Sequence, residues 1–368
     1  MIAITNASLF KNSQLYTGQV ILIAGEKIKA IGTNLDLHGF EIIDAAGGYV
    51  VPGFVDLQIY GSGGDLFSAY PSEATLKQMD ADLITKGTTG FLACVATNSP
   101  EVVYQAISAA KAYREKAKGF LGLHLEGPYL NSKRLGAHVP EYVCKAKLEE
   151  VKRVMEHADG TVKMMTIAAE LQDDEVITYL LKQGVVLSLG HSDASFEQAM
   201  SAYEQGFKTT THLFNAMPSI HHRAPNLPTA VLNHPSAMAS IIADGEHVNF
   251  EIVKMSYQLM GERLFLITDA VTPCQIGPYQ HQLEGDRFVT PNGTLSGSNI
   301  TMLHAIQNCV RYCGVPLDAA LRMASLNPLK LMGMNNKKGL LTVGHTADLL
   351  ILSEELKLQK VFAGGVEY

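Results

Sequence analysis

One glutamate and two histidines in this sequence follow apolar segments and have the residue types that bind a catalytic metal ion. One apolar segment ends at Glu126, a second ends at His191, and a third leads into His212. A catalytic zinc-type ion takes three protein ligands of these kinds and keeps one position open for water. A single histidine after a buried strand is more often a hydrogen-bonded structural residue, but packing alone does not explain three ligand types at three strand ends. The pattern predicts a metal centre that activates water.

Other polar residues follow apolar segments in the same way. They are Gln58 and Tyr60 on the first, Asp244 and His247 after the seventh, and Asp269 at the eighth. Taken alone, Asp269 could cap a helix. In an α/β barrel the active site lies at the carboxyl ends of the strands, so we interpret these residues together with the three ligands.

The elements that must position these residues alternate between strand and helix. The predicted strands are 54–60, 88–96, 120–126, 163–169, 185–191, 209–214, 237–243 and 264–269, and the predicted helices are 72–86, 100–118, 173–183, 194–205, 250–260 and 300–313. A glycine follows each of these helices and can close its last turn in the left-handed conformation. Eight strands alternating with helices predict an α/β fold, a (β/α)8 TIM-like barrel.

The two ends of the chain have a different pattern. Residues 1–51 contain short alternating segments broken by turns, and residues 343–368 contain two more, ADLLILS and QKVFAGGVE. Such segments favour antiparallel pairs over βα units. We expect both ends to form one small β-sandwich domain beside a barrel at 52–342.

The composition excludes several classes of protein. Apolar residues make up 47% and charged residues 18%, which is ordinary for a globular protein. A net charge of −7 without any run of Lys and Arg argues against nucleic-acid binding, and no apolar stretch reaches membrane-spanning length. The first residues lack the pattern of a signal peptide, and five scattered cysteines fit reduced thiols better than disulfides. We expect a cytoplasmic protein.

A series of motifs resembles a known family. PGFVDLQIYGSGG, HLEGPYLN, GHSDA, THLFNAM, HHRAPN, ADGEHV, TDA and GTLSGSN occur in this order. Together they resemble the N-acetylglucosamine-6-phosphate deacetylases of the amidohydrolase superfamily, and with the closing GLLTVGHTADL the match covers nearly the whole chain. The order and spacing of the motifs carry the resemblance, which implies hydrolysis of N-acetyl-D-glucosamine 6-phosphate to D-glucosamine 6-phosphate and acetate.

The resemblance implies that Glu126, His191 and His212 bind the metal and that Asp269 handles the proton. The chemistry agrees, because a bound metal lowers the pKa of water from ~15.7 to about 7. At roughly 1.4 kcal/mol per pKa unit this is worth on the order of 12 kcal/mol. Asp269 would take a proton from the attacking water and deliver it to the departing sugar amine. Such proton transfer typically raises the reaction rate by about 10²- to 10⁴-fold. The metal is therefore the larger contribution.

The resemblance also implies substrate contacts. They are Ala137, His138, Asn215, Ala216, Arg223, His247, Leu295, Ser296, Gly297 and Ser298. His138 could donate to the carbonyl oxygen as it becomes an oxyanion, and His247 could meet the phosphate. Arg223 is expected to bind the phosphate, because a guanidinium matches phosphate oxygens. In the family that the chain resembles, this arginine reaches into the active site of the neighbouring subunit, which implies a homodimer. Without the resemblance, its loop would read as solvated basic residues. HHRAPN departs from the commoner HHREPG at Ala224 and Asn226, which leaves the course of the loop open.

Gln58 and Tyr60 stand where many amidohydrolases have two histidines that hold a second metal. A neutral amide and a phenol are weak ligands for a zinc-like ion, so we expect one divalent metal per subunit. Zinc is the expected ion, although iron, manganese or cobalt could use the same ligands. Gln58 either contacts water or the carbonyl, or only packs. No lysine ends the fourth strand, which argues against a carbamylated-lysine site, and we interpret Glu170 near that end as structural.

Two alternatives remain at this point. One is deacetylation of the galactosamine epimer, which differs only at the C4 hydroxyl. The other is a non-catalytic scaffold, which would be expected to lose a ligand or Asp269, whereas all four residues are present. Lys133 and Arg134 lie in the long loop after the third strand, and we interpret them as solvated charge.

Overall fold

Eight parallel strands form the barrel that the sequence predicts. The structure, a computed structural model, describes residues 1–11 and 13–368. In chain order the strands are β6 (Phe54–Ile59), β9 (Thr88–Ala96), β10 (Phe120–Glu126), β11 (Val162–Ile167), β12 (Val186–Leu189), β13 (Thr209–Thr210), β14 (Met238–Ile241) and β15 (Leu264–Leu266). They lie in this order in one sheet, and each neighbouring pair is parallel.

The barrel closes just beyond β15. There the Asp269 N–H donates to the Gln58 carbonyl over 2.9 Å, and the Tyr60 N–H donates to the Ala270 carbonyl over 2.9 Å. This seam lies at the carboxyl end of the strands, so closing the barrel also places Gln58 and Tyr60 beside Asp269. Strand β13 is shorter than the predicted 209–214, because the backbone leaves the extended conformation at His212, where φ is 33°.

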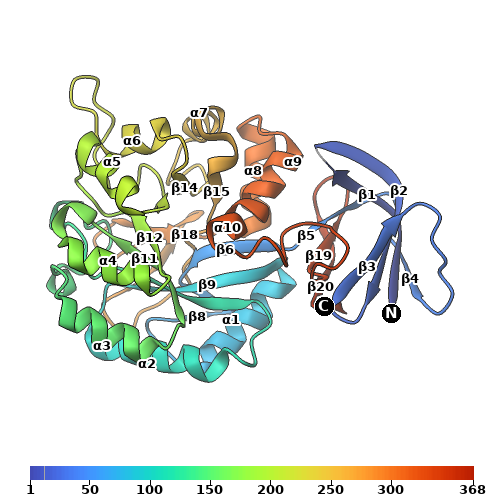
Figure 1. The fold of residues 1–368 in the computed structure, drawn as a ribbon, viewed down its shortest axis with the longest axis horizontal. Helices are drawn as coiled ribbons and strands as arrows, with labels where there is room; N and C mark the ends of the chain where they lie inside the picture. Colours follow the sequence, from blue (N-terminus) through green and yellow to red (C-terminus); the bar gives the residue numbers. More distant parts are fainter. Residues whose placement is uncertain (12) are drawn as a thin grey trace.

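Helices surround the barrel in Figure 1. They are α1 (Glu73–Thr85), α2 (Pro100–Tyr113), α3 (Leu148–Ala158), α4 (Asp174–Lys182), α5 (Phe196–Gln205), α6 (Leu227–Asn233), α7 (Phe250–Met260), α8 (Met302–Tyr312), α9 (Leu317–Met323) and α10 (Leu326–Leu331). Single 3₁₀ turns cover Ser132–Arg134, Pro140–Tyr142, Ala169–Leu171 and Gly261–Arg263. Apolar side chains from the strands and the helices form one continuous core between the two layers. No described helix has the length and apolar character needed to cross a membrane.

Helix α2 ends at Tyr113, five residues before the predicted end of the helix at 118. The chain tightens there, where the Lys116 N–H donates to the Tyr113 carbonyl, and the buried carboxylate of Asp80 then accepts from the backbone N–H groups of Lys118 and Gly119 over 2.8 Å each. Those N–H groups therefore bond to a side chain instead of continuing the helical ladder. The sequence pattern did not reveal helices α3, α6, α9 and α10.

Both ends of the chain form one β domain, as predicted. Its strands are β1 (Ile2–Lys11), β2 (Gln14–Ala24), β3 (Lys27–Gly32), β4 (Glu41–Asp44), β5 (Tyr49–Pro52), β19 (Leu349–Leu352), β20 (Leu358–Ala363) and β21 (Val366–Glu367). Strand β5 pairs antiparallel with β19, and this pairing joins the two ends. Strand β4 pairs parallel with β1, so the expectation of antiparallel pairs throughout is wrong at this position. Figure 1 shows this domain on the opposite side of the molecule from α4 and α5.

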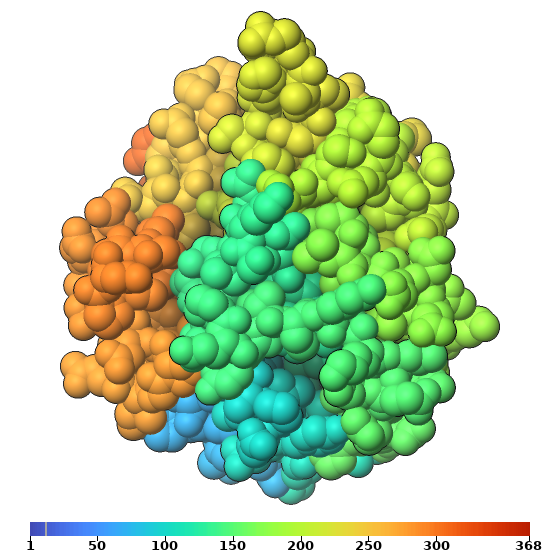
Figure 2. Space-filling model, turned by 90° about the vertical axis from the view of Figure 1, so that its left-hand side faces the viewer, coloured from blue at the N-terminus to red at the C-terminus, as the bar shows by residue number. Residues whose placement is uncertain are grey.

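Segments after the barrel strands cover the carboxyl end. Short strands β7 (Gly61–Ser62) and β8 (Asp65–Leu66) pair with each other, and β16 (Gln282–Glu284), β17 (Arg287–Val289) and β18 (Leu295–Ser298) form a three-stranded antiparallel sheet. Figure 2 views the face away from the β domain. Residues that follow β10 occupy its centre, with the orange segment around β16 to β18 on one side and the yellow loop before α6 projecting at the top.

Candidate metal centre and cavity

The chain turns sharply at three of the predicted residues. His191, His212 and Asp269 have φ angles of 47°, 33° and 54°, in the left-handed region that is costly for residues with a Cβ. The turn at His191 is closely packed. The residue before it, Gly190, lies so near the neighbouring strand that an added Cβ would be only 2.7 Å from Thr166 Cγ2. Strained backbone of this kind persists where its surroundings determine it and clusters at functional sites.

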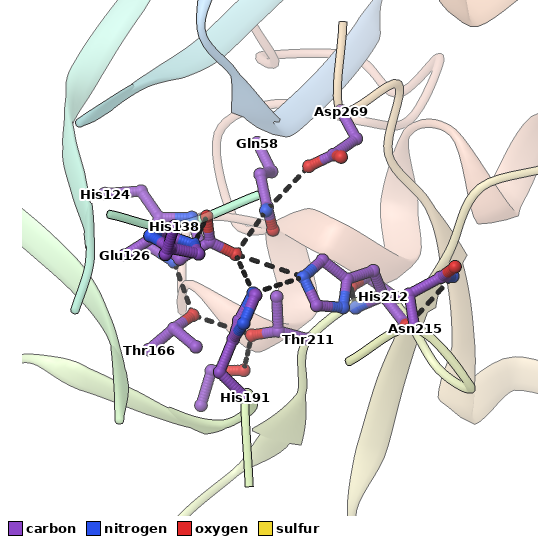
Figure 3. A network of polar contacts seen from close by, with 12 residues as sticks. Gln58, His124, Glu126, His138, Thr166, His191, Thr211, His212, Asn215 and Asp269 are labelled. Carbon is purple, nitrogen blue, oxygen red and sulfur yellow. Dashed lines mark hydrogen bonds and ion pairs between the residues drawn. The ribbon is translucent and has the colours of Figure 1, made fainter. Parts of the chain in front are cut away.

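One carboxylate and two imidazoles meet at the carboxyl end of the barrel. Glu126 Oε1 lies 3.1 Å from His212 Nε2 and 3.3 Å from His191 Nε2, and the two ring nitrogens are 3.1 Å apart. All three residues are buried, and their ligand atoms lie within 4.8 Å of one another. Figure 3 shows both imidazoles directed at the Glu126 carboxylate. Two nitrogens and one oxygen at this spacing could hold one divalent ion.

The two histidines differ in how the second ring nitrogen is held. His191 Nδ1 lies 2.8 Å from the Arg134 carbonyl oxygen. Because a carbonyl only accepts, Nδ1 carries the proton and Nε2 presents its lone pair to Glu126. His212 Nδ1 is buried and has no hydrogen-bond partner among the described residues. A lone pair that faces a carboxylate is unfavourable unless a cation or a proton lies between them, which fits the donor set of a metal centre.

Burial and neighbouring charges shift the pKa values at this centre. Burial alone would raise the pKa of Glu126, but His138 and His191 hold it well below its ordinary value. Burial, together with His138, lowers the pKa of His191 to about 4, so this ring is neutral at pH 7, as a ligand must be. Enclosure in the cavity wall raises the pKa of Asp269 to about 6, although His212 opposes that shift. A carboxyl group with such a pKa can accept and release a proton near neutral pH.

Gln58 and Tyr60 donate hydrogen bonds to the carboxylates of the centre. Gln58 Nε2 lies 3.0 Å from Glu126 Oε1 and 2.7 Å from Asp269 Oδ1. The Tyr60 hydroxyl donates to Glu126 Oε2, and burial raises the pKa of Tyr60 well above its ordinary value, so the phenol keeps its proton. Figure 3 shows the Gln58 amide between the two carboxylates. Both side chains therefore act here as donors.

A cavity lies over the metal centre. It is lined by Tyr60, Leu66, Ser68, Ala96, Glu126, Gly136, Ala137, His138, His191, His212, Asn215, Ala216, His247, Asp269, Val271, Tyr279, His281, Leu295, Ser296 and Gly297. His247 is held by a contact of 2.6 Å between its Nδ1 and Asp244 Oδ2. His138 Nε2 lies 3.0 Å from Glu126 Oε2. The wall thus combines ionisable groups at the metal centre with small and polar side chains.

Known proteins are similar to this chain over nearly its full length. The model of the amidohydrolase family matches residues 49–367. The chain belongs to the amidohydrolase family. N-acetylglucosamine-6-phosphate deacetylase of Haemophilus influenzae is 32% identical to this amidohydrolase over 378 residues, which cover 99% of the chain and 98% of that relative.

Two solved structures confirm the predicted fold of this amidohydrolase. The crystal structure of N-acetylglucosamine-6-phosphate deacetylase from Pasteurella multocida matches with a TM-score of 0.94 at 31% identity and covers 100% of this chain and 99% of that one. An aspartate-to-alanine variant of the Mycobacterium smegmatis deacetylase, in complex with N-acetyl-D-glucosamine-6-phosphate, matches with a TM-score of 0.91 at 31% identity. This match covers 100% of this chain and 98% of that one. The expected resemblance and the barrel with its β domain are therefore confirmed, and the chain belongs to a family of hydrolases.

Most of the predicted substrate contacts of this amidohydrolase lie in the cavity wall, but Ser298 and Arg223 do not. Ser298 is buried behind the wall, because its hydroxyl donates to the Thr268 carbonyl over 2.5 Å. Arg223 is exposed on the loop between β13 and α6, and its guanidinium lies 2.9 Å from His222 Nε2. Gln58 also lies behind the wall, where it contacts the carboxylates.

Several residues of the wall were not predicted from the sequence, and two of them, Tyr279 and His281, carry polar groups on aromatic rings. Tyr279 donates its hydroxyl hydrogen to the Thr97 carbonyl over 2.5 Å, and His281 Nδ1 lies 2.9 Å from Ser296 Oγ. Burial lowers the pKa of His281 to about 4, so its ring enters the cavity uncharged. The available signal was their spacing, because residues two apart on an extended segment face the same side. It could be used only if the segment before β16 were known to cover the barrel end.

Proposed function

We propose that this amidohydrolase hydrolyses the acetamide of N-acetyl-D-glucosamine 6-phosphate and gives D-glucosamine 6-phosphate and acetate. The observation that carries the proposal is the convergence of Glu126, His191, His212 and Asp269 on one cavity. It is supported by relatives of nearly equal length that are N-acetylglucosamine-6-phosphate deacetylases, one of them in complex with this phosphorylated sugar.

Glu126, His191 and His212 would hold one divalent metal, and zinc suits their two nitrogens and one oxygen. The residues fit such an ion, because His191 is neutral with Nε2 unprotonated, and Glu126 is ionised. Burial opposes the protonation of His212, but Glu126 raises the pKa of His212 above its ordinary value, and a cation between the two groups would take the place of that proton. When bound, the ion supplies hydroxide at neutral pH by lowering the pKa of water from ~15.7 to about 7. The chain itself supplies a buried and preorganised ligand set, which costs no reorganisation during the reaction.

Asp269 acts as the base and then as the acid in this proposal. The Gln58 amide fixes its carboxylate, because Nε2 contacts Asp269 Oδ1 at 2.7 Å while it also contacts Glu126 at 3.0 Å. Asp269 takes a proton from the water that attacks the acetyl carbonyl, and it delivers this proton to the sugar nitrogen as the C–N bond breaks. A neutral amine leaves far more easily than an amide anion, so the delivery is as necessary as the attack.

Each subunit holds a single metal in this proposal. The Gln58 amide donates to both Glu126 Oε1 and Asp269 Oδ1, and a neutral amide and the Tyr60 phenol are weak ligands for a second cation. Metal analysis of the purified protein should give one equivalent per chain. Two equivalents, both required for turnover, would contradict the proposal.

His247 and Arg223 bind the phosphate at the other end of the substrate. Asp244 holds Nδ1 of His247, which leaves Nε2 for the substrate. By resemblance to the deacetylase family, Arg223 comes from the second subunit of a homodimer, and its exposed position on its own chain leaves it free to do so. The remaining cavity contacts, Ala137, His138, Asn215, Ala216, Leu295, Ser296 and Gly297, surround the sugar and its acetyl group.

Replacing Arg223 with alanine tests its role in phosphate binding. A hydrogen bond to a charged group is worth about 1.5–3 kcal/mol, so Arg223→Ala should raise KM roughly 10- to 100-fold with a much smaller change in kcat. Steady-state kinetics measure this, and Arg153→Ala, another exposed arginine, is the matched control. Unchanged kinetics in Arg223→Ala would remove the arginine from the phosphate site.

Acetate release from N-acetyl-D-glucosamine 6-phosphate, with and without a chelator, tests the proposed activity. Release that depends on metal and exceeds release from the galactosamine epimer is expected. A higher kcat/KM on N-acetyl-D-galactosamine 6-phosphate would assign the same chemistry to the other sugar. Absence of release from both substrates at full metal loading would contradict the proposal.

A further inference from the structure

Glu170, at the end of the fourth barrel strand, contacts the loops on both sides of that strand. Its Oε1 accepts from Asn131 Nδ2 over 2.9 Å and from the Asp193 N–H over 2.8 Å, and its Oε2 accepts from Ser192 Oγ over 2.8 Å. Asn131 belongs to the loop after β10, the strand that ends at Glu126. The other two donors, Ser192 and Asp193, follow His191 directly. One carboxylate therefore joins the two segments that present different metal ligands.

A second set of contacts joins the same two loops closer to the ligand. Arg134 donates from Nε to Asp193 Oδ1 over 2.8 Å, and its Nη2 lies 2.7 Å from the same oxygen. The Asn131 N–H donates to the His191 carbonyl over 2.9 Å, and the Arg134 N–H donates to the Asn131 carbonyl over 2.8 Å. These bonds define where the Arg134 carbonyl lies relative to the His191 ring.

The Arg134 carbonyl is the group that sets the tautomer of His191. It accepts from Nδ1 over 2.8 Å, which keeps Nε2 unprotonated and directed at Glu126. The partner of a ligating histidine fixes its ring orientation and its tautomer, and loss of such partners typically costs about 10- to 100-fold in metal affinity. His191 has a left-handed backbone, with φ of 47°, so its position depends on contacts of this kind more than that of a residue within a strand would.

We propose that Glu170 is a positioning residue of the metal centre: with Asp193 and Arg134 it holds the Arg134 carbonyl against His191 and thereby sets the affinity for the metal. This inference rests on the proposed function only for the identity of the ligands. It gives a role to Glu170, Lys133 and Arg134, which the sequence presents as a structural residue and two solvated charges. Lys133 contributes least, because its Nζ is 3.4 Å from Asp193 Oδ2 and its side chain is 75% exposed.

The test is the metal dissociation constant of Glu170→Gln, measured by competition with a chromophoric chelator on Zn²⁺ alone, without substrate. Glutamine keeps the size of the side chain but has one accepting oxygen for three donors, so at least one bond is lost. We expect the dissociation constant to rise about 10- to 100-fold. At saturating metal, kcat should return to within a few-fold of wild type. Glu175→Gln, the same change at an exposed position of α4, is the matched control and should leave the affinity unchanged.

Arg134→Ala provides the second variant, because it keeps the carbonyl and removes only the guanidinium that fixes it. It should also weaken metal binding, and its effect should not add to that of Glu170→Gln, since both variants disrupt one network. A dissociation constant within about two-fold of wild type in both variants would overturn the inference. Weaker thermal stability of the metal-free protein with unchanged affinity would also overturn it, since that is the result of a purely structural role.

The outcome for Glu170 is separable from the proposed activity. If the variants bind metal more weakly while the wild type releases no acetate, the positioning role stands and the deacetylase proposal fails. If the wild type binds no divalent metal, both fail.

Discussion

The terminal β domain buries a core of aliphatic side chains around Phe362, whereas the carboxyl end of the barrel buries Glu126, His191 and His212. Both regions contain left-handed residues, Asn6 and Ala46 in the β domain and His191, His212 and Asp269 at the barrel end, but only those at the barrel end carry ionisable side chains of the site. Apolar burial stabilises a fold by about 25 cal/mol per Å², but buried charges and strained turns cost free energy. The β domain therefore adds to the stability of the fold, whereas the arrangement of the site at the barrel end lowers it.

The largest expected effect comes from removing the proton-transfer group at the barrel end. Asp269→Asn should lower acetate release by about 10²- to 10⁴-fold or more, because asparagine cannot take or deliver the proton. Its metal content should stay near normal, and its thermal unfolding temperature should be equal or higher, since a partly buried carboxylate is replaced by a neutral amide. Retention of most of the turnover would show that Asp269 is not the proton carrier.

The matching change in the β domain should do the opposite. Phe362→Ala removes a fully buried aromatic ring and should lower the free energy of unfolding by about 3–5 kcal/mol. Urea unfolding measures this loss. The kcat of the folded enzyme at 20 °C should stay within about two-fold of wild type, because none of the residues that line the cavity belongs to this core. A large loss of kcat in fully folded protein would mean that the two regions are coupled.

A third effect, smaller per pH unit, concerns Asp56, a buried carboxyl at the barrel seam that accepts from the Gln58 and Thr268 N–H groups and from the Thr268 hydroxyl. Burial raises the pKa of Asp56 from 3.8 to about 7, even though these donors oppose the shift. The folded state therefore holds the proton more tightly than the unfolded state. This contribution to stability is complete below about pH 4 and is lost as the pH rises through about 7.

The variant Asp56→Asn isolates the part of the pH dependence of stability that comes from Asp56. Between pH 4 and 7 the wild type should lose up to about 1.4 kcal/mol of stability per pH unit relative to the variant. Urea unfolding of both proteins at several pH values gives the difference, which cancels the other titrating groups. A difference that does not change with pH would show that Asp56 titrates normally.

The sequence predicts the barrel and the three ligands because both depend on local patterns. Apolar runs that lead into Glu126, His191 and His212 mark three strand ends, and a parallel barrel brings all such ends to one face. Glu170 and Arg134 could not be assigned in this way. Their partners lie on other loops, and loop courses follow from tertiary contacts that leave no periodic signal. The parallel pairing of β4 was missed for the same reason.

The wall residues Tyr279 and His281 were hidden for a related reason. They belong to the segment around β16 to β18, which has neither the strand–helix period nor a barrel position, although it closes over the cavity. The Gln58 and Tyr60 pair was recognised as unusual, but its role as a donor pair appears only when Glu126 and Asp269 are seen on either side of it.

Stepwise return of Zn²⁺ to the metal-free protein, with acetate release followed at each step, tests the central claim most directly. Convergence of Glu126, His191 and His212 on one ion, with Asp269 beside it, predicts no turnover without metal and a linear rise that stops at one equivalent per chain. Turnover that persists in the metal-free protein, or that begins only with a second equivalent, would contradict the account.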